Sequence, residues 1–283
     1  MKFLYVTDLH GNIWKLNLIF EIARSLKVKT VINGGDILPM GNLLKQDDFI
    51  VNFLDTYFKK FDSEKINLVN LLGNDDVAIF DDLFEKICNK YSYIFSNAQR
   101  IVKVEDYEFI GTNYVIDYPF ALKDRCRMDD NEFILPRQFG KPVISTLKGW
   151  SYIDDWVSYI KNLTTIEEEL NNLIRPNDFQ KTIYIIHNPP SNLGLDVCSD
   201  GRRVGSKAVY NFIKKNQPLL TLHGHIHESP QMSGIWCSKI DNTICIQPGQ
   251  SQQSQDFLIY VLVDLKEMIY ERYIIDKFNN SFI

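Results

Sequence analysis

All five histidines of this 283-residue chain occupy positions typical of metal ligands. His10 lies in the segment Asp8-Leu9-His10, and His187 directly follows the apolar run 183–186. The other three occur together in Leu222-His223-Gly224-His225-Ile226-His227. Neutral imidazole is the commonest nitrogen ligand of transition metals. Random placement would rarely put every histidine at the end of a predicted strand beside Asp, Gly or Asn, so this distribution indicates a metal centre.

The candidate ligands combine oxygen and nitrogen donors without a thiolate: Asp8, His10, Asp36, Asn74, His187, His225 and His227. Such a set suits Mn, Fe, Zn or Co, and suits neither copper nor iron–sulfur chemistry. These ligands are more than one metal ion can coordinate. If one carboxylate bridges two ions, the set can hold both ions and leave coordination positions open for solvent and substrate. Two divalent ions about 3.5–4 Å apart clamp the attacking and leaving oxygens of an in-line phosphoryl displacement. Two carboxylates against two dications leave a net positive site, which would attract a phosphate and lower the pKa of a bound water.

The elements that position these ligands alternate between strands and helices in the first part of the chain. Predicted strands at 3–7, 30–33 and 67–72 each end in a turn that carries a candidate ligand, and helical spacing follows at 14–26, 49–61 and 80–87. This alternation predicts a largely parallel sheet, whose ligand site lies at the carboxyl ends of the strands. Further strands are predicted at 107–112, 182–186, 219–222, 234–238, 243–246, 257–263 and 268–274. Short turns join the last four, which favours a meander in a second, more antiparallel sheet.

Residues 117–178 interrupt the pattern and are predicted to form an insertion or cap within a single domain that spans residues 1–283. Three prolines and several arginines occur between 117 and 149 without a clean period. Residues 150–174 are predicted to be helical, and Thr165-x-x-Glu168 has the pattern of a capping box.

Bulk properties exclude several classes of protein. A net charge of −5 and a pI of about 5.6 imply no basic face, which argues against a nucleic-acid partner. The chain has no apolar run long enough for a membrane span, and its first apolar run is too short for a signal peptide. The five cysteines show no CxxC spacing, so neither a disulfide framework nor a zinc knuckle is expected. The sequence therefore predicts a cytoplasmic protein; no oligomeric state is predicted.

The ordered motifs resemble the calcineurin-like metallophosphoesterase superfamily: Asp8-Leu9-His10-Gly11, Gly35-Asp36, Gly73-Asn74-Asp75-Asp76, His187 and Gly224-His225-Ile226-His227. The resemblance covers nearly the whole chain in the family order. It implies an α/β/β/α four-layer sandwich, with two mixed β-sheets, helices on the outer faces and a dinuclear metal site at the strand ends. A longer stretch, from His187-Asn188-Pro189-Pro190 to Glu228, is similar to a narrower group of bacterial and archaeal phosphoesterases of undefined substrate.

The resemblance also implies a role for each ligand. Asp8, His10 and His227 would hold one ion, and Asn74, His187 and His225 would hold the other. Asp36 would bridge the two ions. A metal-bridging hydroxide would then attack the phosphorus.

One departure concerns the residue that protonates the leaving oxygen. The family often has Gly-Asn-His-Asp/Glu, whereas this chain has Asp75 at the histidine position. A carboxyl group with a pKa of about 4 is a poor acid at neutral pH, and a nearby dication lowers that pKa further. Either Asp75 is structural, or the enzyme favours esters with good leaving groups, or another residue is the donor. His223 is the alternative donor, because strand alternation would place it on the side of His225 and His227; otherwise it orients a ligand.

Substrate contacts are predicted beside a helix start. Ser206 is a candidate N-cap, and Arg202 and Arg203 precede it, so this segment could bind a phosphate; the alternative is a capped surface loop. Phe120, Arg125 and Arg127 in the insertion are further candidates by location alone.

These observations predict a metal-dependent phosphoesterase for a small phosphate ester, with a phosphodiester favoured over a monoester. Its two divalent ions would be manganese in the first instance, with Fe, Zn, Co or Ni as alternatives. The rival hypotheses are a non-catalytic metal-binding scaffold of the same fold and a nuclease.

Overall fold

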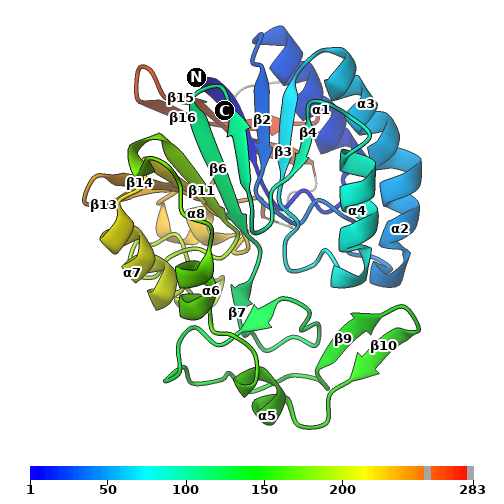
Figure 1. Cartoon of the computed structure of the whole chain (residues 1–283), viewed down its shortest axis with the longest axis vertical. Coiled ribbons are helices and arrows are strands. Elements are labelled where there is room, and N and C mark those ends of the chain that lie inside the picture. The colour runs from blue at the N-terminus through cyan, green and yellow to red at the C-terminus, as the bar shows by residue number, and fades with distance from the viewer. Residues whose placement is uncertain (252–255, 279–283) are drawn as a thin grey trace.

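The computed structural model describes residues 1–251 and 256–278, and two six-stranded sheets form its centre (Figure 1). The first sheet has the order β16-β15-β1-β2-β3-β4 and the second has the order β13-β14-β12-β11-β6-β5. The first contains β1 (Lys2–Val6), β2 (Thr30–Asn33), β3 (Asn67–Asn70), β4 (Ile94–Ser96), β15 (Phe257–Asp264) and β16 (Ile269–Asp276). The second contains β5 (Ile101–Val104), β6 (Tyr107–Thr112), β11 (Thr182–Ile186), β12 (Leu220–Leu222), β13 (Cys237–Ile240) and β14 (Thr243–Ile246).

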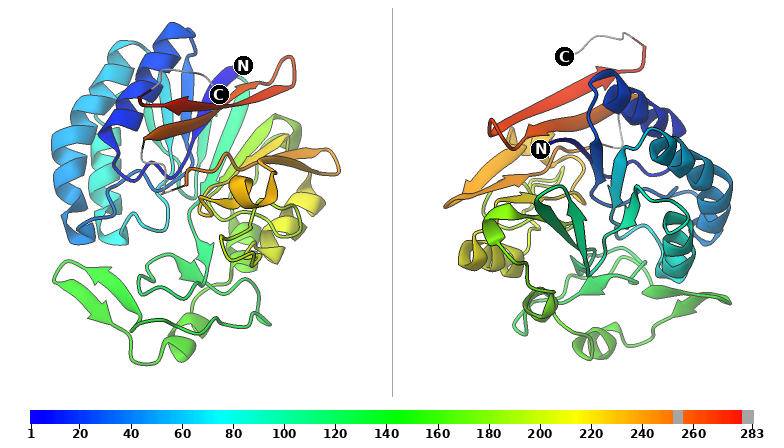
Figure 2. Two further views of the ribbon diagram at one scale, coloured as in Figure 1. Left: turned by 180° about the vertical axis from the view of Figure 1, so that it is seen from behind. Right: turned by 45° about the horizontal axis from the view of Figure 1, so that its top comes forward.

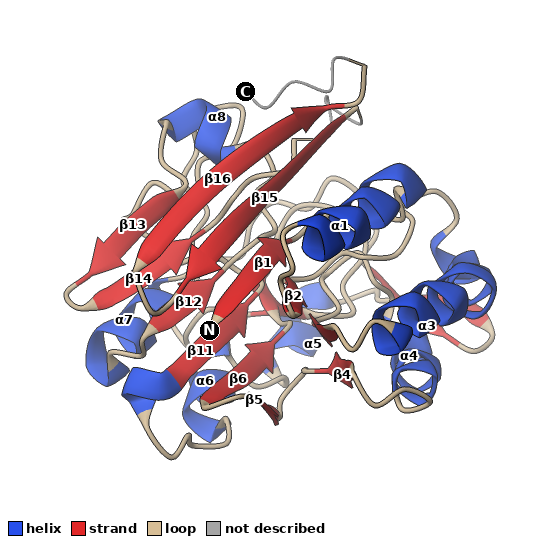
Figure 3. Cartoon of the chain, turned by 90° about the horizontal axis from the view of Figure 1, so that it is seen from above, coloured by secondary structure: helices blue, strands red, loops and turns tan. Residues whose placement is uncertain are grey.

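Helices cover the outer face of each sheet, as the view from above shows (Figure 3). On the first sheet these are α1 (Ile13–Ser25), α2 (Gln46–Phe49), α3 (Asp55–Ser63) and α4 (Asp81–Cys88). The second sheet is covered by α6 (Ile166–Asn172) and α7 (Lys207–Asn216), and the short α8 (Ser229–Ser233) precedes β13. The predicted α/β class with two mixed sheets and outer helices is confirmed. No helix within the described residues is long and apolar enough to cross a membrane.

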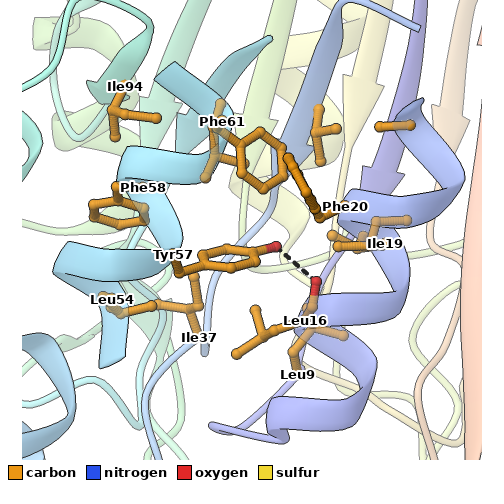
Figure 4. Close-up of a cluster of buried hydrophobic side chains, with 14 of the residues drawn as sticks. Leu9, Leu16, Ile19, Phe20, Ile37, Leu54, Tyr57, Phe58, Phe61 and Ile94 are labelled. Atoms are coloured by element: carbon orange, nitrogen blue, oxygen red, sulfur yellow. Dashed lines mark hydrogen bonds between the residues drawn. The ribbon is translucent and has the colours of Figure 1, made fainter. Parts of the chain in front are cut away.

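Strand alternation explains the layers. In β1, Phe3 and Tyr5 enter the apolar cluster between the sheets, whereas Leu4 and Val6 enter the cluster under the helices. Both faces of the strand are therefore buried, as is usual for strands in a sheet that is covered on both sides. The cluster under α1 and α3 is shown in Figure 4, where the Tyr57 hydroxyl donates to the carbonyl of Leu16 at 2.9 Å.

The last four strands do not form one meander, which corrects the sequence prediction. β13 and β14 pair antiparallel at the edge of the second sheet, whereas β15 and β16 pair antiparallel at the edge of the first. β15 also pairs antiparallel with β1. Short turns fix each hairpin, but they carry no information about the sheet that a hairpin joins. The chain passes from one sheet to the other between β14 and β15.

The predicted helices are found with some changes at their ends. α1 begins after Asn12, whose side chain accepts the backbone N–H of Lys15. The helix predicted at 49–61 is divided among α2, a π-helical stretch at Ile50–Leu54, and α3. The capping box of Thr165 and Glu168 is present at the start of α6.

The 117–178 segment lies below the carboxyl ends of the central strands (Figures 1 and 2). It contains β8 (Cys126–Arg127), which pairs with β7 (Val115–Ile116), the hairpin of β9 (Val143–Thr146) and β10 (Gly149–Tyr152), and α5 (Trp156–Lys161). The predicted helix over 150–174 is therefore wrong at its start, because that region pairs with β9 as a strand. A small apolar cluster that includes Cys126, Trp156 and Ile160 holds this segment together.

Candidate metal centre

The seven candidate ligands come together at the carboxyl ends of β1, β2, β3, β11 and β12. Each one has a nitrogen or oxygen atom within 4.0 Å of a nitrogen or oxygen atom of another. The loops that carry them follow parallel strands that lie next to one another in each sheet. The adjacency of these strands brings together residues that are far apart in the sequence.

The backbone of these loops adopts unusual conformations. Asp8, His10, Asp36 and His225 have φ angles of 57°, 45°, 52° and 69°, in the left-handed region that L residues rarely occupy. Such conformations persist where the surrounding structure fixes them, and they cluster at functional sites. Gly73 shows how closely the loops approach, since a Cβ atom there would lie 2.2 Å from Oδ1 of Asp36.

One group of ligands consists of Asp8, His10, Asp36 and His227, whose donor atoms lie within 4.8 Å of one another. The Nε2 atoms of His10 and His227 are 3.0 Å apart, and Nε2 of His227 is 3.4 Å from Oδ1 of Asp8. Two imidazole nitrogens and a carboxylate oxygen therefore converge on one position.

A second group surrounds the side-chain oxygen of Asn74. This oxygen lies 3.0 Å from Nε2 of His187 and 2.6 Å from Nδ1 of His225. Asp36 connects the two groups, because its Oδ2 is 3.3 Å from Nε2 of His187 and 4.0 Å from Nε2 of His10.

Buried polar atoms without partners test whether cations fit this arrangement. Within the described residues, Oδ2 of Asp8 and Nδ1 of His10 are buried and have no hydrogen-bond partner, whereas the buried Oδ2 of Asp36 lies within ion-pair distance of His187, at 3.3 Å. A buried carboxylate oxygen without a partner is energetically costly unless a cation or a donor approaches it. The orphan oxygen of Asp8 and the mixed donor set therefore fit divalent cations.

Charges inside the site oppose the effect of burial on the histidines. Burial lowers the pKa of His187, but the carboxylates of Asp36 and Asp8 outweigh it and raise that pKa to about 9. His227 behaves in the same way, since Asp8 raises its pKa against burial. The pKa values of both carboxyl groups are lowered, because the neighbouring imidazolium rings outweigh burial. In the metal-free protein, protons on His187 and His227 thus balance the two carboxylates, and metal ions would displace them.

Comparison with known proteins identifies the family. The sequence profile of the calcineurin-like phosphoesterases matches residues 1–229. The chain belongs to this family. Its members are metal-dependent phosphoesterases, which agrees with the cluster of Asp and His donors described above.

Two solved structures show the same fold at low sequence identity, and a third aligns with a lower TM-score. One shares 16% identity with a TM-score of 0.61 and covers 96% of this chain and 97% of its own. The protein TT1561 of Thermus thermophilus shares 14% identity with a TM-score of 0.56 and the same coverage. An archaeal phosphodiesterase shares 13% identity with a TM-score of 0.48, covering 97% of this chain and 100% of its own. A comparison with curated proteins gives no match.

Asp75 of this calcineurin-like phosphoesterase lies beside the ligands. Its backbone N–H donates to Oδ1 of Asp36 at 2.8 Å, and its carboxylate accepts from Nδ2 of Asn74 at 2.9 Å. Burial and the charge of Asp36 raise the pKa of Asp75 to about 7 in the metal-free protein. Bound cations would act in the opposite direction.

Asp76 is a structural residue of the site that the sequence analysis missed. Its carboxylate accepts backbone N–H groups of Gly73 at 2.7 Å and Leu38 at 2.8 Å, so it ties the loop of Asn74 to the loop of Asp36. Arg125 of the insertion is buried and donates to the carbonyls of Gly73 and Asp76, which leaves it no free face for a substrate. The position of Asp76 in the motif was visible in the sequence, but its backbone partners were not.

His223 does not share the orientation predicted for it. Its Nδ1 lies 2.9 Å from the carbonyl of Ile186, and its Nε2 lies 2.8 Å from the hydroxyl of Thr221. The prediction that strand alternation places His223 with His225 and His227 is wrong: His223 stays on the side of Thr221, as alternation requires, and the alternation breaks at His225, whose φ is 69°. Both ring nitrogens are occupied, and burial lowers the pKa of His223 to about 4.

The predicted phosphate site beside Ser206 is filled by a carboxylate of the chain itself. Ser206 caps α7, as predicted, by accepting the N–H of Val209 at 2.9 Å. Asp129 accepts the Ser206 hydroxyl and the N–H of Lys207. The exposed Arg202 pairs with Asp200 at 2.6 Å, and the exposed Arg203 lies 4.0 Å from Asp196. The position for an anion at this helix start is therefore occupied, which corrects the prediction of substrate contacts there.

Proposed function

We propose that this protein hydrolyses a small phosphate ester at two divalent cations. Asp8, His10 and His227 would hold one cation, and Asn74, His187 and His225 would hold the other. Asp36 would contact both, and the position of its buried carboxylate between the two groups is the observation that carries the proposal. The bound cations would neutralise phosphate charge and lower the pKa of a water nucleophile. Manganese is the first candidate for this oxygen and nitrogen donor set.

A phosphodiester fits the surroundings better than a monoester. The carboxylate of Asp75 lies beside Asn74 and adds a negative charge at the edge of the ligand set. A phosphodiester carries one negative charge, whereas a monoester carries two near neutral pH, so this carboxylate repels the monoester more strongly. We therefore favour phosphodiesterase activity.

The chain also favours substrates with good leaving groups. Both ring nitrogens of His223 have partners, and Asp75 stands at the sequence position where the family often has a histidine. Asp75 is ionised once cations lower its pKa, so protonation of a leaving alkoxide would be inefficient. Esters of acidic alcohols need less protonation and should react faster.

Turnover of two chromogenic esters tests the proposed activity. Protein loaded with Mn²⁺ should hydrolyse bis-p-nitrophenyl phosphate faster than p-nitrophenyl phosphate, and EDTA should abolish both reactions. The Asp36→Asn variant should be inactive, whereas Asp154→Asn, which alters an exposed carboxylate in the insertion, should retain activity. Absence of turnover of either ester by the fully metal-loaded protein would instead support a non-catalytic metal-binding scaffold.

A further inference from the structure

A row of aromatic side chains leads from the metal centre into the insertion. The ring centroid of Tyr118 is 5.7 Å from that of His225, and the centroid of Phe120 is 6.0 Å from that of Tyr118. Phe139 follows, with its centroid 6.0 Å from that of Phe120 and the two rings at 76°. We call Tyr118, Phe120 and Phe139 the aromatic row. It begins against a proposed metal ligand.

The far end of the row is exposed to solvent. The exposed fraction is 64% for Phe120 and 69% for Phe139. Single exposed apolar residues are common, but these two rings contact each other and continue a row from a catalytic centre. Apolar rings favour contact with a further ring, because such contact removes apolar surface from water and adds favourable ring–ring geometry. The exposed rings therefore offer a surface for an aromatic group.

A buried ion pair holds the beginning of the row in place. Nζ of Lys123 lies 2.7 Å from Oδ1 of Asp117, and neither side chain is exposed. The same ammonium group donates to the carbonyl of Tyr118 and lies 4.9 Å from the centroid of its ring. The indole N–H of Trp156 donates to Oδ2 of Asp117 at 2.9 Å. Tyr118 is thus fixed through both its backbone and its ring.

Two hydrogen bonds also join the segments that carry the exposed rings. The backbone N–H of Phe139 donates to the carbonyl of Pro119 at 2.8 Å. The side chain of Gln138 donates to Oδ2 of Asp117 at 3.0 Å. Because the rings of Phe120 and Phe139 are held next to each other before any ligand arrives, less conformational entropy is lost when a ligand contacts both.

We propose that Phe120 and Phe139 bind an aromatic ring in the organic part of the substrate ester. The substrate class would then be phosphate esters with an aryl or heteroaryl group a short linker away from the phosphorus, rather than simple alkyl or sugar phosphates. This inference rests on the proposed function only in placing the phosphate at the metal centre. The ring would lie on the far side of Tyr118 from His225, at the solvent end of the row.

Binding of two non-hydrolysable ligands tests this inference. The probes are 3-phenylpropylphosphonate and propylphosphonate, which share a phosphonate head and a propyl chain and differ only in the ring. Titration calorimetry with Mn²⁺-loaded protein should show tighter binding of the aromatic probe by roughly 5- to 150-fold, the range expected for one stacked ring. Replacing both phenylalanines (Phe120→Ser with Phe139→Ser) should abolish this preference and leave the affinity for propylphosphonate unchanged.

Two control variants test whether the loss of the ring preference is specific to the aromatic row. Phe278→Ser removes a phenylalanine that is 75% exposed beyond β16, and it should keep the full preference. If the double serine variant does not fold, as judged by thermal unfolding, Phe120→Leu with Phe139→Leu keeps apolar volume and should still lose most of the preference.

The outcomes distinguish this inference from the proposed function. Equal affinity of the native protein for both probes would overturn the inference, and so would a preference that survives in the folded double variant. A ring preference without turnover of any ester would overturn the proposed function and leave the aromatic site standing. Turnover without a ring preference would overturn only the aromatic site.

Discussion

Replacement of Asp36 by Asn should perturb the two halves of the proposed metal centre together. Asp36 is buried, and its Oδ1 accepts the N–H of Asp75 at 2.8 Å. Its Oδ2 lies 3.3 Å from Nε2 of His187 and 4.0 Å from Nε2 of His10. Asparagine has nearly the same volume and keeps an oxygen for the N–H of Asp75. The substitution therefore removes a negative charge without removing the contact that holds the loop.

The size of the effect follows from the charge that is lost. A unit charge about 4 Å from another unit charge contributes about 4 kcal/mol at an effective dielectric constant of 20. Each dication would lose at least this attraction, and 1.4 kcal/mol corresponds to about a tenfold change in a binding constant. We therefore expect Asp36→Asn to weaken the binding of each ion by about a thousandfold.

Metal content after equilibration measures this loss. Native protein and Asp36→Asn would be dialysed against the same micromolar Mn²⁺ and analysed by inductively coupled plasma mass spectrometry. We expect about two equivalents in the native protein and clearly fewer in the variant. Asp154→Asn is the matched control, because the Asp154 side chain is 90% exposed and pairs with the exposed Lys141. Two full equivalents in an active Asp36→Asn variant would refute the bridging role.

Three further predictions concern the acid position, the metal-free state and the α7 cap. Asp75→His should increase hydrolysis of alkyl esters by roughly 10²–10⁴-fold relative to nitrophenyl esters; an equal effect on both classes, or loss of metal, would argue against it. In EDTA, the melting temperature should decrease as the pH is raised from 6.5 to 8. The pKa of His187 is raised to about 9 in the folded protein and is about 6.5 in the unfolded chain, so its protonation stabilises the folded state fully below pH 6.5. This stabilisation is lost as the pH rises, and the free energy of unfolding should fall by about 2 kcal/mol between pH 6.5 and 8. An unchanged pH dependence of the melting temperature in His187→Gln would contradict this assignment. Asp129→Ala should lower the stability by about 1–2 kcal/mol and leave turnover unchanged, since it removes acceptors at the start of α7; a lower kcat/KM would instead place this helix start in the substrate site.

The sequence alone could predict that the ligands meet, because parallel strands end at a common edge. Asp8 follows β1, Asp36 follows β2 and Asn74 follows β3, and these strands are neighbours in the first sheet. Each strand is a short apolar run followed by a glycine-containing turn, which is a local signal. The capping box at Thr165 is equally local, and the structure contains it.

Features that depend on long-range contacts could not be predicted in this way. Asp129 is distant in sequence from the start of α7, where its carboxylate accepts the backbone N–H of Lys207. The residues near Ser206 give no signal that a carboxylate of the chain itself takes the place where a bound anion was predicted. His223 illustrates a second reason. His223 keeps the side of Thr221, as alternation requires, but alternation stops at His225, where φ is 69°, so His223 and His225 point in different directions. The division of the last four strands between two sheets is a third case, because hairpin turns fix pairing within a hairpin and nothing beyond it.

The 117–178 segment contacts the candidate metal centre at two separate places, which limits how the segment can act. Arg125 donates to the carbonyls of Gly73 and Asp76 beneath the loop of Asn74, and Tyr118 lies against the ring of His225. Arg125 is buried, so separation of the insertion would leave carbonyls of a ligand loop without their donor and expose a charged group that pairs with Asp81. Separation would exchange these hydrogen bonds for bonds to water, and a hydrogen bond to a charged group contributes about 1.5–3 kcal/mol net. These contacts favour a fixed wall of the site over a cap that opens freely, and a fixed wall is the arrangement in which Phe120 and Phe139 could select a substrate.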